Sequence, residues 1–230
     1  MIKRSMILVA LVLSGAAVAA PAQPDMTGVW SILNAPQALK TVEGQTPPLL
    51  PGAKKVYEAH LAALAKGDRS FDETTFCLPP GLPRLMIEDK PFEILQRPKQ
   101  VFFVHQINRL PRRVYLNETI PDDIDSFYLG YSVGKWEGGE LVVDTKGFRE
   151  GVTLLDRSGL PHSAALHLTE RYKLSANGKT LTARFTIDDP KTYARPWSAT
   201  ATYAKRPAGF QIPEEVCADS LKSSAPRPRD

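Results

Sequence analysis

The turn at Asn177-Gly178 constrains the fold of this chain more than any other feature, because Asn-Gly is the strongest short-range signal for a two-residue β-hairpin turn. The segments on either side, 166–174 and 180–187, alternate apolar and polar residues as half-buried strands do. A two-residue loop fixes the register of the two strands. In that register one face of the hairpin is apolar except for Glu170, which faces Phe185 across the pair.

The chain after residue 91 is interpreted as further strands. Gly138-Gly139 marks a second hairpin between two alternating segments. Only 52–66 places apolar residues at helical spacing, with Pro51 at its start and Gly67 after its end. Serial hairpins with one helix predict an antiparallel meander, and a two-sheet sandwich is the alternative. The other expected strands are 101–108, 113–117, 129–136, 140–148 and 198–204.

The first strand candidate contains Gly28-Val29-Trp30. A Gly-x-Trp strand followed by serial hairpins resembles the lipocalin-like, or calycin, barrels, which close a meander around a ligand cavity. We therefore expect a mainly β protein: an antiparallel lipocalin-like β-barrel with one helix and an N-terminal Pro-rich region.

The N-terminus has the three parts of a secretory signal peptide. Lys3 and Arg4 precede an apolar run, and small residues follow it up to Ala19 and Ala20. We expect a signal peptide at 1–19 and a single β-barrel domain at 20–230, and therefore a periplasmic or secreted protein. An uncleaved anchor is the alternative, but the apolar run is too short for a membrane span, which needs about 20 residues.

The charge of the chain excludes some partners. The formal net charge is +4, and removal of Lys3 and Arg4 with the signal peptide leaves +2. The sequence has no Lys/Arg cluster broad enough for a nucleic-acid footprint. We expect no nucleic-acid partner and no membrane span, and a small apolar or aromatic ligand instead.

The two cysteines, Cys77 and Cys217, are expected to form a disulfide, because paired thiols oxidise outside the cytoplasm. The bridge would tie the start of the domain to its C-terminal tail. A catalytic thiol is the alternative, although the sequence has no Cys-x-x-Cys motif.

Two ionisable residues occupy apolar strand faces. Glu170 must be paired, hydrogen-bonded or protonated there, and burial would suit it to acid or base work. Its other interpretation is a structural ion pair, for example with Arg84. His105 shares a face with Val101 and Phe103, and is either a base, a ligand or a packed core histidine.

The next strand begins Arg112-Arg113-Val114-Tyr115, so Arg113 and Tyr115 share one face. An arginine facing a cavity would bind a carboxylate through two hydrogen bonds. We assign that role to Arg113 and expect Arg112 to lie on a solvated edge. His162-Ser163 lies in a loop before Glu170, where loop capping and catalysis are both open.

No metal or cofactor is expected. The four histidines lack zinc-ligand spacing, and no Gly-rich phosphate loop is present. Asp122-Asp123-Ile124-Asp125 lacks the glycine and the terminal glutamate of a calcium loop, so a solvated acidic turn is expected there.

Several short motifs lie along the chain: Cys77-x-Pro-x-Gly-x-Pro-Arg84, Gly134-x-Trp136-Glu137-Gly138, Leu141-Val142-Val143-Asp144-Thr145-x-Gly147-Phe148, Pro161-His162-Ser163, Glu170-Arg171 and Asp188-Asp189-Pro190-x-x-Tyr193-x-x-Pro196-Trp197. Together they resemble a large family of secreted bacterial proteins, most of which have no assigned activity. The chain departs from the family at Asn117-Glu118-Thr119, where an Asp-Gly-Arg turn is usual, and at Tyr131, where an acidic residue is common. These changes predict a more aromatic pocket.

Two functions of different class follow. The expected barrel is similar in shape to the phenolic acid decarboxylases, which work without a cofactor, so we favour a lyase or isomerase that acts on an apolar aromatic acid. A periplasmic binding or carrier protein for a hydrophobic small molecule is the alternative. The expected catalytic residues are Glu170, His105, Tyr115 and His162. The expected substrate contacts are Arg113, Arg84, Tyr131, Tyr172 and Trp136.

Overall fold

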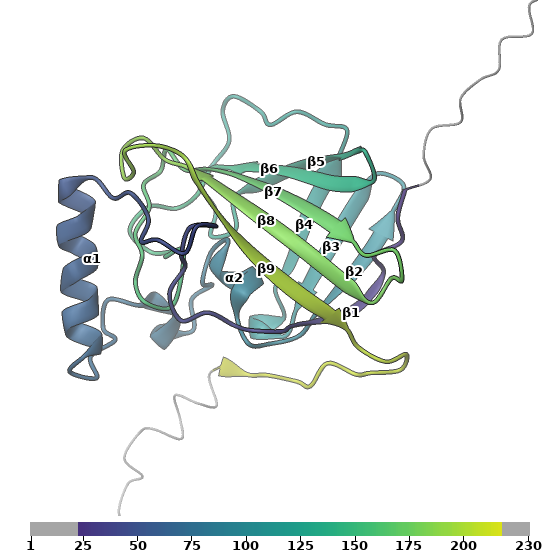
Figure 1. The fold of residues 1–230 in the computed structure, drawn as a ribbon, viewed down its shortest axis with the longest axis horizontal. Helices are drawn as coiled ribbons and strands as arrows, with labels where there is room; N and C mark the ends of the chain where they lie inside the picture. Colours follow the sequence, from purple (N-terminus) through teal and green to yellow (C-terminus); the bar gives the residue numbers. More distant parts are fainter. Residues whose placement is uncertain (1–22, 218–230) are drawn as a thin grey trace, which may run out of the picture.

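The computed structural model describes residues 23–217, and nine strands in chain order close into a barrel (Figure 1). The first and last strands pair with each other, which confirms the expected barrel over the alternative sandwich. The predicted signal peptide, 1–19, lies outside the described residues. The strands are β1 Gly28–Ile32, β2 Phe92–Arg97, β3 Gln100–His105, β4 Pro111–Leu116, β5 Tyr131–Glu137, β6 Glu140–Lys146, β7 His167–Leu174, β8 Thr180–Asp188 and β9 Trp197–Lys205.

The barrel departs from a purely antiparallel meander at one pair of strands. β4 and β5 are parallel, whereas the other neighbours around the ring are antiparallel. Strand directions alternate around a ring of antiparallel pairs, so a ring with an odd number of strands needs a parallel pair. The loop 117–130 makes this crossover, and the parallel ladder runs only from Val114↔Ser132 to Leu116↔Gly134.

The predicted register of the β7–β8 hairpin is correct, because Glu170 pairs with Phe185 and Leu174 with Leu181. The expected two-residue loop is wrong: the ladder ends at Leu174↔Leu181, and the Ser175 N–H donates to the Thr180 carbonyl, so the connection through Asn177-Gly178 is longer. β5 and β6 pair Glu137 with Glu140 around two glycines of positive φ. Glu170 therefore points into the barrel, as its register predicted.

Side chains from all nine strands pack the barrel interior. The interior is aromatic at its centre, where the rings of Phe92 and Phe103 lie next to those of Tyr203 and Tyr172. Trp30, Phe103, Tyr172, Phe185 and Tyr203 are all fully buried. The grooves described below open to the surface instead.

The Pro-rich region and the C-terminal segment meet beside the barrel. The short helix α2, Arg84–Ile87, buries Leu85, Met86 and Ile87. The interior residue Tyr203 donates a hydrogen bond to the Met86 carbonyl at 2.9 Å, which fixes α2 against the barrel. Cys77 and Cys217 form the predicted disulfide and join these two parts of the chain.

The helix predicted at 52–66 is α1, Pro51–Leu64, and it stands beside the barrel (Figure 1). Its Tyr57 hydroxyl lies 2.8 Å from the Ser158 hydroxyl. Its His60 ring stacks on Phe71 and forms a 2.7 Å hydrogen bond with the Gly159 carbonyl. His60 is thus a packing residue. None of the helices within residues 23–217 is long and apolar enough to cross a membrane.

Candidate functional site

A buried polar network occupies the barrel interior and is centred on Glu170. Its Oε1 accepts hydrogen bonds from Arg112 Nη1 at 3.0 Å and from the Tyr172 hydroxyl at 2.7 Å. Its Oε2 accepts a short hydrogen bond from Arg112 Nη2. Arg112 Nη2 also donates to Ser132 and Thr145 at 3.2 and 3.1 Å. Each charged group therefore has close partners, as a buried ion pair requires.

The environment of this network favours the charged form of its arginine. Burial lowers the pKa of Arg112, but the Glu170 carboxylate and Tyr172 outweigh it, so the pKa is raised above its usual value. Burial, together with Glu170, raises the pKa of Tyr172 well above its ordinary value. Tyr172 is therefore a neutral hydrogen-bond donor inside the core.

Arg112 and Arg113 have the reverse of their expected places. Arg112 points into the barrel and is 2% exposed, so the expectation of a solvated edge is wrong. Arg113 lies on the outer face of β4 and is exposed. The alternation of the strand explains the difference, because Arg112 shares its face with the apolar residues Val114 and Leu116.

His105 is buried in the interior beside the Phe92 ring, with the two centroids 5.3 Å apart. Burial, aided by the positive charge of Arg112, lowers the pKa of His105 to about 3. Among the described residues its Nε2 has no hydrogen-bond partner. The imidazole is consequently neutral at physiological pH, and it fits the interpretation as a packed core histidine better than that as a base.

A groove lies on the outer face of the barrel at the β4–β5 seam, and we call it the β4–β5 groove. Its volume is about 270 Å³. Three residues predicted to contact the substrate or to react with it, Arg113, Tyr115 and Tyr131, come together in its wall. The groove is lined by Pro111, Arg112, Arg113, Tyr115, Phe127, Leu129, Gly130, Tyr131 and Ser132.

The β4–β5 groove combines an aromatic wall with an exposed cation. Tyr115 and Tyr131 stack with ring centroids 5.1 Å apart and planes 13° from parallel. The Arg113 guanidinium carbon lies 5.7 Å from the Tyr115 centroid and 5.3 Å from that of Phe102. Burial, with Glu118 and Tyr115, raises the pKa of Tyr131, which keeps its phenol neutral. Such a wall suits a planar, anionic ligand.

Glu170 does not share this groove with Arg113. The side chains of Arg113 and Tyr115 lie on the outer face of the barrel wall, whereas Glu170 lies in the interior. Arg112 connects the two regions, because it lines the groove and pairs with Glu170. The expected constellation of acid, base and substrate contacts is thus divided between the two sides of the sheet.

His162 and Ser163 belong to a buried loop cluster. Ser163 donates hydrogen bonds from its backbone N–H and its hydroxyl to the two oxygens of Asp189, both at 2.6 Å. His162 Nδ1 lies 2.9 Å from the Ser163 carbonyl, and its Nε2 lies 2.6 Å from the Thr153 hydroxyl. Burial lowers the pKa of His162. These bonds satisfy the loop internally and agree with the capping interpretation.

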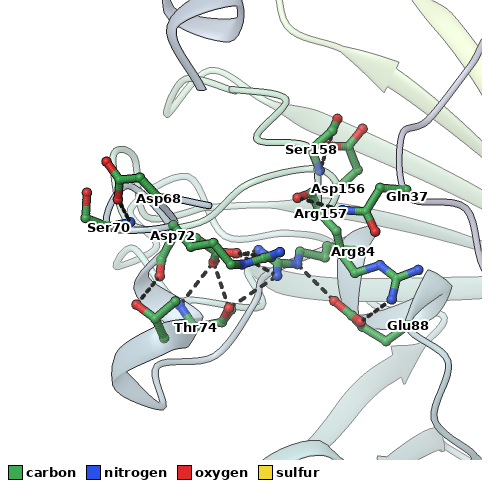
Figure 2. A network of polar contacts seen from close by, with 12 residues as sticks. Gln37, Asp68, Ser70, Asp72, Thr74, Arg84, Glu88, Asp156, Arg157 and Ser158 are labelled. Carbon is green, nitrogen blue, oxygen red and sulfur yellow. Dashed lines mark hydrogen bonds and ion pairs between the residues drawn. The ribbon is translucent and has the colours of Figure 1, made fainter. Parts of the chain in front are cut away.

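Arg84 is the centre of a second buried ion-pair network, drawn in Figure 2. Its two Nη atoms donate to the two oxygens of Asp72 at 2.8 and 3.0 Å, and its Nε donates to Glu88 at 2.9 Å. The partner of Glu170 is therefore Arg112, and Arg84 instead pairs with two other carboxylates.

Trp136, also predicted to contact the substrate, lies on the inward face of β5 and is half-buried against the core. Sequence reasoning missed Arg112, Ser132 and Thr145 as members of the interior network. The apolar residues Val114 and Leu116 were the available signal for Arg112. Within residues 23–217 there is no group of three or more metal-ligating side chains.

No protein-family model matches the chain. The curated proteins include no match to it. The resemblance to the secreted bacterial family remains a prediction from its motifs, and the function must be argued from the site itself.

Proposed function

We propose that this protein binds a small aromatic carboxylic acid in the β4–β5 groove and releases it unchanged. The observation that carries the proposal is the placement of an exposed arginine, Arg113, beside the stacked pair of Tyr115 and Tyr131. The tyrosine rings would stack on the ring of the ligand. The guanidinium would pair with its carboxylate through two hydrogen bonds.

The volume of the groove, about 270 Å³, fits a single ring with a short substituent and lies just below the usual range of small-molecule pockets. Within the described part of the chain, Arg113 has a weak hydrogen-bond partner, because its Nη1 donates to the Tyr115 hydroxyl at 3.4 Å. A ligand carboxylate would therefore displace no strong interaction of this arginine.

The binding function is favoured over a decarboxylase by the state of Glu170. Both of its oxygens accept hydrogen bonds, and Arg112 stands between it and the groove. A general acid or base needs access to the reacting group. We also propose that the protein works outside the cytoplasm, which the disulfide and the N-terminal pattern support.

The test is calorimetric titration of the protein with benzoate, 4-hydroxybenzoate and 4-hydroxycinnamate, with benzamide as the neutral control. We expect Arg113→Gln to weaken binding of the acids about tenfold or more, the effect of losing a charge-assisted hydrogen bond. The matched control is Arg184→Gln, which changes an outward-facing arginine on β8. Equal binding by Arg113→Gln and wild type would refute the proposal. Mass analysis of each mixture decides between the two functions, since a product lighter than the added acid by the mass of CO2 identifies a decarboxylase.

A further inference from the structure

A second pocket, of about 340 Å³, lies between the Pro-rich region and the C-terminal segment, and we call it the arginine pocket. It shares no lining residue with the β4–β5 groove. Its wall contains the buried network of Figure 2, and Cys217 brings the C-terminal segment to it through the disulfide. Four basic side chains line it: Arg69, Arg84, Lys90 and Arg157.

Carboxylates satisfy most of these cations. Arg84 has close partners in Asp72 and Glu88, as described above. Arg69 lies 3.1 Å from Asp72, and Lys90 lies 3.3 Å from Glu215. Among residues 23–217, the carboxylates that pair with these three cations are Asp72, Glu88 and Glu215, so the four cations exceed their carboxylate partners by one charge.

Arg157 is the cation with the weakest partners. Its Nη1 lies 3.8 Å from the nearest oxygen of Glu88, and its Nη2 donates to the carbonyls of Ala35 and Pro36 at 3.4 Å each. Its Nε is buried and has no hydrogen-bond partner among the described residues. A buried donor without an acceptor is unfavourable, so this guanidinium is short of one close acceptor.

The rest of the wall indicates the remaining chemistry of the ligand. Leu78, Pro80 and Ile107 supply an apolar surface, and Asn108 supplies an amide. A planar guanidinium matches a carboxylate in shape, and a single surplus charge matches a monoanion. The volume lies within the range of small-molecule pockets.

We propose that the arginine pocket binds a small aliphatic monocarboxylate, whose carboxylate pairs with Arg157 and whose alkyl part contacts Leu78, Pro80 and Ile107. This site is separate from the β4–β5 groove, and it makes the protein a receptor for two different acids. The loose contacts of Arg157 allow its guanidinium to turn toward the ligand without breaking the Arg84 network.

The test is an NMR titration of the 15N-labelled full chain with hexanoate at fixed ionic strength. We expect saturable shifts of the Arg157 Nε–H signal and of the backbone amides of Leu78 and Asn108. Arg157→Gln should raise the dissociation constant for hexanoate about tenfold or more, as expected for loss of a charge-assisted hydrogen bond. Arg113→Gln, in the other groove, should leave it unchanged.

Three comparisons keep the proposal open to refutation. Hexanamide, which is neutral, should bind at least tenfold more weakly than hexanoate, and equal binding would overturn the role of charge even if no Arg157 variant folded. Arg157→Lys keeps the charge but loses the planar fork, and full affinity in this variant would overturn the pairing. Inorganic phosphate that binds as tightly as hexanoate would overturn the assignment to a carboxylate.

Discussion

The interior ion pair predicts a large loss of stability for Glu170→Gln. The amide keeps the shape of the side chain, but it leaves the buried charge of Arg112 without its carboxylate. Removal of one partner from a buried ion pair typically costs about 3–5 kcal/mol. A domain of ordinary stability has about 5–15 kcal/mol in total, so the variant should fold but unfold far more readily.

The assay is equilibrium unfolding in urea, read by circular dichroism, with the free energy of unfolding taken from the linear extrapolation. The matched control is Glu140→Gln on the outer face of β6, because its ion pairs with Arg171 and Lys173 are partly exposed. Exposed pairs contribute about 0–1 kcal/mol, so this control should stay close to wild type.

A double variant separates the charge from the shape. Arg112→Met with Glu170→Leu removes both charges, and replacement of a buried pair by apolar residues is often neutral or stabilising. We expect the double variant to recover most of the stability lost by Glu170→Gln. A loss below about 1 kcal/mol in Glu170→Gln would refute the reasoning. Intact stability together with lost turnover would favour the acid/base function predicted from the sequence.

Three further predictions concern His105, the disulfide and Arg84. His105→Phe should reduce the pH dependence of the free energy of unfolding. The pKa of His105 falls from 6.5 unfolded to about 3 folded, so its contribution to stability is complete above pH 6.5 and should fall by about 1.4 kcal/mol per pH unit below it. The free energy of unfolding, measured at pH 7 and pH 5, checks this. An equal change between the two pH values in wild type and in His105→Phe would contradict it. Replacement of Cys77 and Cys217 by serine should lower the free energy of unfolding by up to about 5 kcal/mol, because the bridge closes a loop of 140 residues; a thermal melt that matches wild type would contradict this. Arg84→Gln should cost about 3–5 kcal/mol in a urea titration, because Asp72 loses its buried partner and keeps only the half-exposed Arg69, and a change near zero would show that the pair is not structural.

The sequence was most informative where a turn determined the register. Asn177-Gly178 predicted that Glu170 faces inward opposite Phe185, and the ladder confirms this pairing. A hairpin turn is local, so the pairing of the strands beside it follows from neighbouring residues even though this turn is longer than the two residues expected. The disulfide was predictable for a different reason, because two cysteines allow only one intramolecular pairing.

The partner of Glu170 was harder to predict. Arg112 is 58 residues away in the chain and reaches Glu170 across β5 and β6. Its neighbour Arg113 offered the same chemistry, and only the apolar face of Val114 and Leu116 distinguished the two. The parallel pairing of β4 with β5 follows from the odd number of strands. It could not be predicted, because the strand at 92–97 was not identified individually from the sequence.

The contact between the first and last strands has a consequence for the order of folding. β1 meets β9 through three residue pairs, from Trp30↔Lys205 to Ile32↔Tyr203, so the chain must close on itself over nearly its whole described length. Once Cys77 and Cys217 are joined, the shortest covalent path between these strands falls from roughly 175 to roughly 60 residues, which lowers the entropic cost of loop closure by about 1 kcal/mol. If the disulfide forms before the barrel closes, pairing of β1 with β9 is therefore faster. In the reduced chain the same pairing requires closure of the longer loop.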